Sequence, residues 1–219
     1  MSLCRLAQVA VCCAGLSTLG ACTTMQPSYD YTNFRAHPPR SILVLPPLNQ
    51  STHVEATYGY LSTVTFPVAE LGYYVFPVEV VDLFFQENGM PTAGEMHQVP
   101  LGKVFEITGA DAVMFITLEQ YGSSYQVIDS STVVKAHAKL VDTRTQLLLW
   151  EGRGAAVQSS SGGSSNVLAK LIAAAVSQAI NSSVDRAHGV SRLANANLFR
   201  AKSVGLPYGP YSPQYNTPY

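Results

Sequence analysis

The feature that most constrains this chain is the short apolar segment at its start. Arg5 and the free amine make a positively charged beginning, and residues 6–19 are mostly apolar. This order is typical of a secretory signal peptide. The apolar run is about 14 residues long, shorter than the roughly 20 residues that a helix needs to cross the hydrocarbon core of a membrane. We therefore expect residues 1–21 to be a signal that is removed on export.

The cysteines indicate where the signal ends. Cys4, Cys12 and Cys13 lie inside the expected signal, which leaves Cys22 as the one thiol of the mature chain. Leu19-Gly20-Ala21-Cys22 resembles the lipobox of bacterial lipoproteins. The resemblance implies cleavage between Ala21 and Cys22 and acylation of the Cys22 thiol and the new amine. An exported chain with one unpaired cysteine raises the question of a reactive thiol, which acylation answers. The alternative is an ordinary signal peptide with an incidental cysteine.

A lipid on Cys22 would anchor the protein to a membrane. Each buried methylene contributes about 0.8 kcal/mol, so two or more acyl chains give a lasting anchor. Thr23 follows the cysteine, whereas lipoproteins retained in the inner membrane often carry Asp there. The resemblance therefore implies the outer membrane, with the folded domain in the periplasm. Apart from this covalent lipid we expect no cofactor and no metal.

Composition excludes two classes of protein. The chain has 13 Lys and Arg against 14 Asp and Glu, and its charged fraction of 12% is about half of the roughly 25% that is typical of soluble domains. The basic residues are scattered, so a nucleic-acid partner is not expected. An apolar fraction of 47% with a net charge of -1 also excludes disorder along the whole chain.

The first half of the mature chain predicts a tether followed by a parallel unit. Residues 22–39 contain three prolines among polar residues, which indicates a lipidated tether. Residues 41–48 and 73–76 are predicted strands. Helical spacing predicts two helices. The first has a kink or restart at Pro67, and its apolar face consists of Val54, Tyr58, Leu61, Val64, Val68 and Leu71. The second is opened by Pro77, and its apolar face consists of Val80, Val81, Phe84 and Phe85. Strand and helix alternate, so we expect a parallel pair of strands.

The second half predicts an antiparallel hairpin. A short helix is expected at residues 100–107, a central strand at 112–118, and a strand at 134–140 whose strict alternation places Leu140 inside and Lys139 outside. A turn at 142–145 leads into 146–151. The predicted fold class is therefore α/β, a single domain over residues 40–190 with a mixed sheet, a parallel βαβ start, an antiparallel C-terminal hairpin and helices packed on the sheet.

Two segments near the C-terminus are candidate partner surfaces. Residues 166–184 have an apolar helical stripe, which predicts a helix that covers the sheet. Its other face carries small and polar residues, among them Lys170, Ala174, Ser177, Gln178 and Asn181, which could instead contact another subunit. Residues 191–219 are a predicted C-terminal extension. Its last 13 residues, 207–219, hold four prolines and four tyrosines, so we expect an extended, mobile tail in which Tyr208, Tyr211 and Tyr215 could bind a partner.

The sequence contains no recognisable catalytic motif. It has no G-x-S-x-G, and His53, His97, His137 and His188 are isolated from one another and have no zinc spacing. His53 and Glu55 would not face each other on a helix, so we expect a solvated capping role. Asp111, Asp129 and Asp142 have plainer roles at strand starts or turns. We therefore expect no enzyme.

Several segments together resemble a known family. They are residues 40–47, 70–77, 111–113, 121–126 and 138–142, and they are similar to the neisserial vaccine-candidate lipoprotein family of unknown function. The order of elements also resembles the amino-terminal domain of TolB and the periplasmic domain of curli-secretion lipoproteins. The family has no established catalytic residues, so the resemblance implies none here.

These observations favour a non-catalytic accessory or scaffold in an envelope transport, secretion or assembly complex. The expected partners are the membrane, through the lipid, and envelope proteins, which could include a curli-secretion-like lipoprotein or further copies of this chain. One alternative is a binding lipoprotein that contacts peptidoglycan or its synthase. Another is a hydrolase whose dispersed carboxylates are brought together by the fold.

Overall fold

The structure is a computed structural model, and it describes residues 29–125, 130–159, 183–215 and 217. These residues form one six-stranded sheet in the order β3-β1-β4-β5-β6, and β2 pairs with β4 off this path. The strands are β1 (Ser41–Val44), β2 (Leu48–Asn49), β3 (Tyr74–Val75), β4 (Ala112–Tyr125), β5 (Ser130–Asp142) and β6 (Leu148–Ser159). The helices are α2 (Thr32–Ala36), α3 (Ala56–Glu70), α4 (Val78–Glu87), α5 (Ala93–Met96), α6 (Leu101–Thr108) and α8 (Ser183–Phe199).

The N-terminal half of the sheet is parallel. β1 pairs in parallel with β3 on one side and with β4 on the other, so that Ile42 lies opposite both Val75 and Ala112. A parallel pair needs a long crossover connection. α3 lies in the crossover from β1 to β3, and α4, α5 and α6 lie in the one from β3 to β4. The predicted α/β class with a parallel start is confirmed.

The C-terminal half consists of three long antiparallel strands, β4, β5 and β6. The predicted facing of β5 is confirmed, because Leu140 is completely buried opposite Trp150 while Lys139 is exposed. β4 and β6 extend beyond the predicted ranges 112–118 and 146–151. Their outer halves are rich in Gly, Ser and Gln, residues that weaken the apolar alternation by which strands are recognised.

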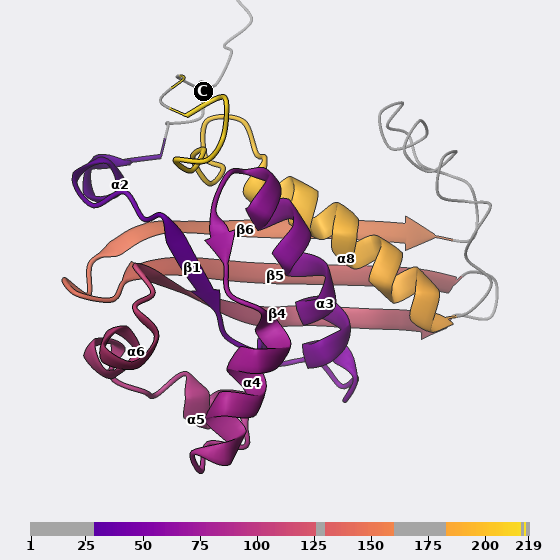
Figure 1. The fold of residues 1–219 in the computed structure, drawn as a ribbon. Helices are drawn as coiled ribbons and strands as arrows, with labels where there is room; N and C mark the ends of the chain where they lie inside the picture. The colour runs from indigo at the N-terminus through magenta and orange to yellow at the C-terminus, as the bar shows by residue number, and fades with distance from the viewer. Residues whose placement is uncertain (1–28, 126–129, 160–182, 216, 218–219) are drawn as a thin grey trace, which may run out of the picture.

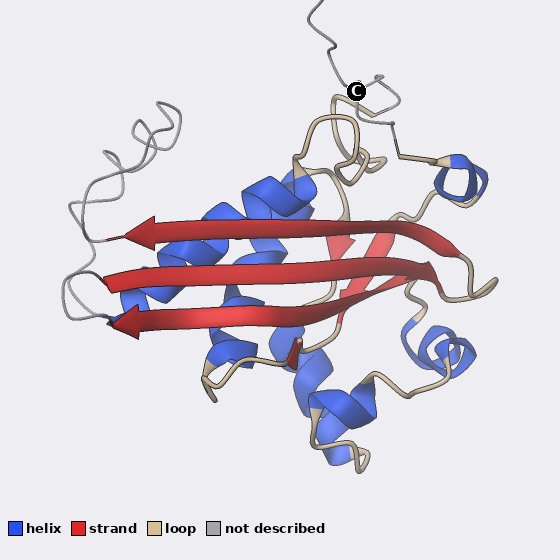
Figure 2. Ribbon diagram, turned by 180° about the vertical axis from the view of Figure 1, so that it is seen from behind, coloured by secondary structure: helices blue, strands red, loops and turns tan. Residues whose placement is uncertain are grey.

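Helices cover the two faces of the sheet unequally. α3 and α8 pack on one face, in a core that includes Ile42 and Met114. Leu43 and Val113 alternate with these residues along the strands and pack on the other side in a second core, to which α4, α5 and α6 contribute. Figure 2 shows β4, β5 and β6 from behind, with no helix in front of most of their length.

The tether prediction is wrong from residue 29 onward. Tyr31, directly before α2, and Phe34 within it are buried in the larger core. The Tyr31 hydroxyl donates a hydrogen bond to the Gly205 carbonyl oxygen at 2.6 Å. One aromatic residue in a five-residue helix and another directly before it give no periodicity, so this docking leaves no clear pattern in the sequence.

The predicted end of the domain at residue 190 falls inside α8. Val190 and Ala194 are both fully buried in the same core, so α8 is one element of the domain. The apolar stripe is hard to recognise because Ser191 and Asn195 are buried along with it. Of the helix predicted at residues 166–184, all but residues 183–184 lie outside the described chain.

The first part of the Tyr/Pro tail is packed on the domain, which corrects the expectation of an extended, mobile end. The Gly209 amide donates to the Leu71 carbonyl oxygen at 2.8 Å, and the Tyr211 amide donates to the Gly72 carbonyl oxygen at 3.1 Å. The Tyr73 hydroxyl donates to the Pro207 carbonyl oxygen at 2.5 Å. We call residues 207–211 the strap. Figure 1 shows it in yellow, near α2 and the end of α8.

Three positions of the two predicted apolar helix faces are exposed instead of buried. Val80 is 64% exposed, and it is Val81 and Phe85 that face the core. The apolar residues of α4 extend beyond its buried side, so the helical period alone does not select the residues that face the core. Val54 lies before α3 and is exposed, and so is Tyr58. The helix α3 continues through Pro67 without the predicted restart.

Candidate functional site

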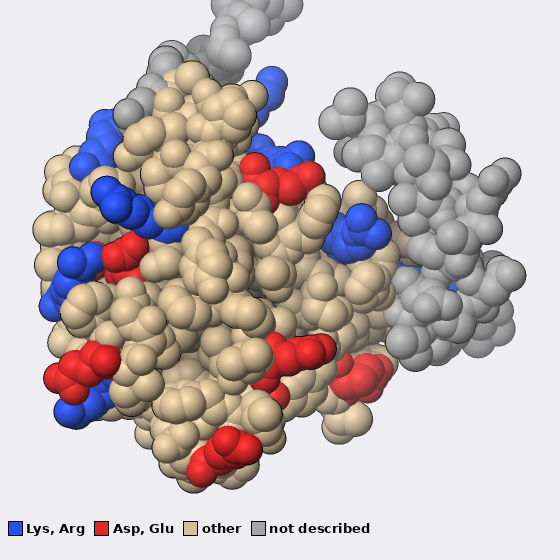
Figure 3. All heavy atoms as spheres, in the orientation of Figure 1, with Lys and Arg blue, Asp and Glu red and all other residues tan. Residues whose placement is uncertain are grey.

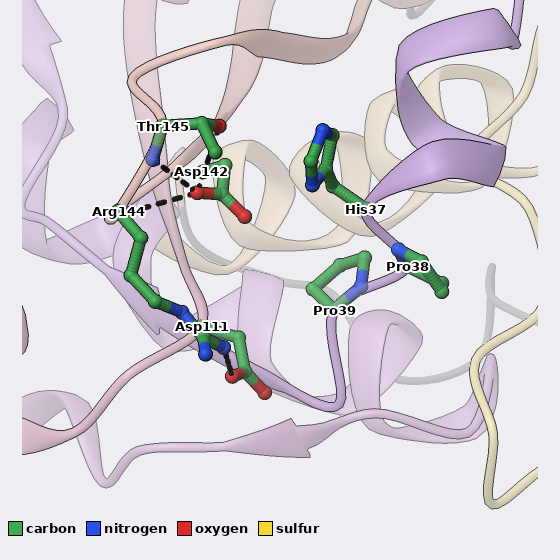
Figure 4. A pocket seen from close by; sticks show the side chains of 7 residues that line it. All are labelled: His37, Pro38, Pro39, Asp111, Asp142, Arg144 and Thr145. Carbon is green, nitrogen blue, oxygen red and sulfur yellow. Dashed lines mark hydrogen bonds and ion pairs between the residues drawn. The ribbon is translucent and has the colours of Figure 1, made fainter.

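A polar pocket of about 310 Å³ lies at the amino ends of two parallel strands. Its lining includes His37 and Pro39 before β1, Asp111 before β4, and Asp142 and Arg144 in the turn after β5. Figure 4 shows the Arg144 side chain reaching Asp111, with His37 on the opposite side. In open α/β sheets, ligands bind outside the carboxyl ends of the strands. This pocket is at the other end.

Asp111 joins three segments of the fold. Its Oδ2 accepts hydrogen bonds from the amides of Arg40 and Ser41 at 3.0 and 3.2 Å and from the Ser41 hydroxyl at 3.2 Å. Its Oδ1 accepts from Arg144 at 2.6 Å, and the Arg144 guanidinium lies 4.9 Å from the ring centre of Phe105. Both oxygens are therefore occupied in holding β1, β4 and the turn after β5 together.

Asp142 has the turn role that the sequence predicts. Its Oδ1 accepts hydrogen bonds from the amides of Arg144 and Thr145 at 2.9 and 2.7 Å and from the Thr145 hydroxyl at 2.9 Å. Such bonds from an Asp to the backbone just after it are typical of tight turns. Asp129 lies outside the described residues. The two described carboxylates thus serve the fold, and the hydrolase alternative gains no support from this pocket.

A buried polar network connects α3 to α8. The Tyr60 hydroxyl donates to Asn195 Oδ1 at 2.5 Å, and Asn195 Nδ2 donates to the Thr63 hydroxyl at 2.8 Å. Burial raises the pKa of Tyr60 well above its ordinary value, so the phenol stays protonated. Asn195 is fully buried, and each of its groups would be costly there without a partner. The network therefore fixes how the two helices dock.

The histidines do not come together. His53 Nδ1 lies 3.3 Å from Glu55 Oε1, which corrects the expectation that these side chains would not meet. The expectation failed because α3 begins at Ala56, so both residues lie before the helix, and neither caps it with its side chain. The His97 ring donates to the Pro46 carbonyl oxygen at 2.9 Å, and burial lowers its pKa. Across the part of the chain that the structure describes, no three His, Cys, Asp or Glu side chains are placed to hold a metal.

Most residues of the predicted sites lie outside the described chain. These are Ala21 and Cys22 of the lipobox and Lys170, Ala174, Ser177, Gln178 and Asn181 of the candidate surface, so all of these assignments stay predictions. Within the described ranges, no helix is both long and apolar enough to span a membrane. The predicted tail residues are described, and Tyr208 and Tyr215 are half-buried while Tyr211 is 68% exposed.

The strap holds Tyr211 in place by its backbone. The Tyr211 amide is bonded to Gly72 while its ring points away from the core. Tyr211 was predicted from the sequence as part of a candidate surface, but the sequence did not indicate why its position is fixed. That reason is the close passage of the strap over Gly72, which has a φ of +91° and no Cβ.

Three large apolar side chains on α3 and α4 are exposed, which was not predicted from the sequence. Phe66 on α3 and Val80 and Leu83 on α4 are 63%, 64% and 55% exposed. Val80 was predicted to be buried because apolar residues at helical spacing are most often core, while Phe66 and Leu83 were assigned to neither side. Val80 and Leu83 are three residues apart and so lie on one side of α4, and exposed apolar patches often mark sites of protein contact.

A mixed α/β domain that follows a signal segment and a lipobox cysteine is typical of a bacterial envelope lipoprotein. Residues 29–211 match the model of the GNA1162-like lipoprotein family, and the chain belongs to this family. The family resemblance found in the sequence is thereby confirmed, while the likeness to TolB and the curli-secretion lipoproteins stays a prediction.

Similar proteins come from Neisseria meningitidis. A lipoprotein of serogroup B strain MC58 is 43% identical over 199 residues, which is 90% of this chain and 93% of that protein. The crystal structure of lipoprotein GNA1162 has a TM-score of 0.55 and 46% identity, covering 66% of this chain and 100% of that chain. The PelC dodecamer of Paraburkholderia phytofirmans is more distant, with a TM-score of 0.45 and 11% identity over 76% of this chain and 90% of that chain.

Proposed function

We propose that this protein is a non-catalytic accessory or scaffold lipoprotein in an envelope transport, secretion or assembly complex. In this proposal, lipid on Cys22 holds it in the outer membrane, and the α/β domain works in the periplasm through its surface. Membership of a lipoprotein family and the lipobox at residues 19–22 support the anchor.

The observation that carries the proposal is the presentation of Tyr211. An exposed tyrosine offers a large contact area with few rotamers to immobilise, and such residues are common in protein-binding surfaces. Here the backbone bond to Gly72 holds it in a strap that is itself packed on the domain. The polar groups of the pocket at Asp111, by contrast, are used to hold the fold together.

The proposal is tested by placing a photo-crosslinking amino acid at position 211 of the full-length lipoprotein in cells. Tyr211 is largely exposed, so the change should not disturb folding. The control carries the same group at Lys139, which is exposed on the sheet. We expect a reproducible adduct with one envelope protein from position 211 and none from 139. A peptidoglycan synthase in the adduct would favour the alternative function, and the absence of any adduct at 211 would contradict the proposal.

A further inference from the structure

Charge is divided unequally between two parts of the described chain. Residues 41–102 contain no Lys or Arg and six acidic residues, Glu55, Glu70, Glu79, Asp82, Glu87 and Glu95. Residues 183–202, which comprise α8 and the start of the following turn, contain Arg186, Arg192, Arg200 and Lys202 against one acid, Asp185. Figure 3 shows basic side chains over the region of α8 and acidic ones over the region of α4, on one side of the molecule. That side therefore has an acidic part and a basic part.

The basic part contains a groove between α3 and α8. It has a volume of about 260 Å³, and its lining includes Phe66 from α3 and His188, Arg192 and Ala196 from α8. The α8 residues are exposed at intervals of four, so they form one edge along the helix. Glu70 is also in the lining but is paired with Arg200 at 2.6 Å. Arg192 has no ion-pair partner among the described residues.

The acidic part contains a ridge of matching chemistry. α4 exposes Val80 and Leu83, and the acidic residues Glu79 and Glu87 are exposed on the same helix. Residues three, four and seven apart lie on one side of a helix, which places Glu87 beside Val80 and Leu83. The ridge is therefore apolar and acidic, whereas the groove is apolar and basic.

We infer that the groove between α3 and α8 binds α4 of a second copy of this chain. In this contact Leu83 lies against Phe66 and Ala196, and Glu87 faces Arg192. Complementary charge is what favours this occupant, because it selects the partner and repels wrong ones. Both surfaces are on the side of the molecule seen in Figure 3, so two copies can exchange both contacts about a two-fold axis. The inference concerns self-association and does not depend on the envelope partner proposed above.

The contact is tested with two differently tagged full-length chains expressed together. One carries Leu83→Cys and the other Ala196→Cys, both at exposed positions. The mature chain has no native thiol besides Cys22. After mild oxidation we expect a disulfide-linked species of dimer size that contains both tags. The control pairs the Leu83→Cys chain with a Lys139→Cys chain and should give none. No cross-link, or equal cross-linking in the control, would overturn the inference.

A charge exchange makes the test specific for this pairing. Arg192→Glu introduced into both cysteine chains should lower the cross-linked fraction about tenfold, because the new carboxylate then faces Glu87. Glu87→Lys in both chains should have the same effect, because the new ammonium then faces Arg192. Placing Arg192→Glu in one chain and Glu87→Lys in the other restores the opposite pairing in both contacts and should restore the yield. Failure to restore it would overturn the inference, as would a cross-link from position 196 to a different protein in place of the second copy.

Discussion

Gly209 of the strap lies directly against Gly72 at the end of α3. A Cβ added to Gly209 would lie 2.3 Å from the Gly72 carbonyl oxygen, and one added to Gly72 would lie 2.3 Å from the Ser212 amide nitrogen. The two backbones approach this closely because neither residue has a side chain. The C-terminal segment is thereby held against the turn between α3 and β3, where it covers Leu71 and Tyr73.

Replacing Gly209 with alanine should destabilise the domain. The new methyl group would collide with backbone, so the strap must move, at a cost of about 1 to 3 kcal/mol. Urea unfolding of the mature chain with Cys22→Ser measures the loss. The control is Gly102→Ala on α6, where an added Cβ meets no atom within 4 Å, and this change should be neutral or slightly stabilising. Equal effects would mean that the strap does not pack as described.

Deleting residues 207–219 should lower the melting temperature. The deletion removes the hydrogen bonds from Gly209 and Tyr211 to the α3–β3 turn and the acceptor of the Tyr73 hydroxyl. Each bond contributes about 0.5 to 1.5 kcal/mol, so we expect a fall of at least about 4 °C by calorimetry. An unchanged melting temperature would restore the view of this segment as a solvated end.

The facing of β5 gives a matched pair of variants. Leu140 is completely buried opposite Trp150, whereas Lys139 is exposed. Leu140→Ala should therefore cost about 2 to 4 kcal/mol in the free energy of unfolding, and Lys139→Ala should stay within about 0.5 kcal/mol. Denaturant unfolding compares the two, and similar losses would show that the register of the strand is different.

His97 should make stability depend on pH in the mildly acidic range. Burial lowers the pKa of its imidazole below the ordinary value of 6.5. The unfolded chain therefore takes up the proton first, so this contribution to stability is complete above about pH 6.5 and is lost as the pH falls through the folded pKa. His97→Gln keeps a donor for Pro46 and should flatten the dependence of stability on pH below about pH 6.5. A profile that His97→Gln leaves unaffected would contradict this assignment.

The central fold could be predicted because its signals are local and repeated. The alternation around Leu140 determines which side of β5 is buried, and the order of strand and helix before residue 100 predicts the parallel start. The docked ends could not be predicted, because they depend on contacts between distant residues. Tyr31 with Gly205 and Tyr73 with Pro207 are examples, and no period in the sequence marks them.

The candidate surfaces could be predicted only in part, for the same reason. The sequence identified Tyr211 by its composition, but a Pro- and Tyr-rich segment reads as solvated unless its attachment to Gly72 is known. It placed Val80 in the core because apolar residues at helical spacing usually belong there. Which of the apolar residues of α4 face water is decided by tertiary packing, here by the contact of Val81 and Phe85 with the sheet.

The anchor at Cys22 is central to the proposed function, and one labelling experiment tests it. Full-length chains with Cys22 or with Cys22→Ser are expressed in cells supplied with a labelled fatty acid, and the membranes are then fractionated. Because Cys22 is the one cysteine after the signal, the account predicts label and outer-membrane recovery for the native chain and loss of both for Cys22→Ser. Label and membrane recovery that survive the substitution would contradict it.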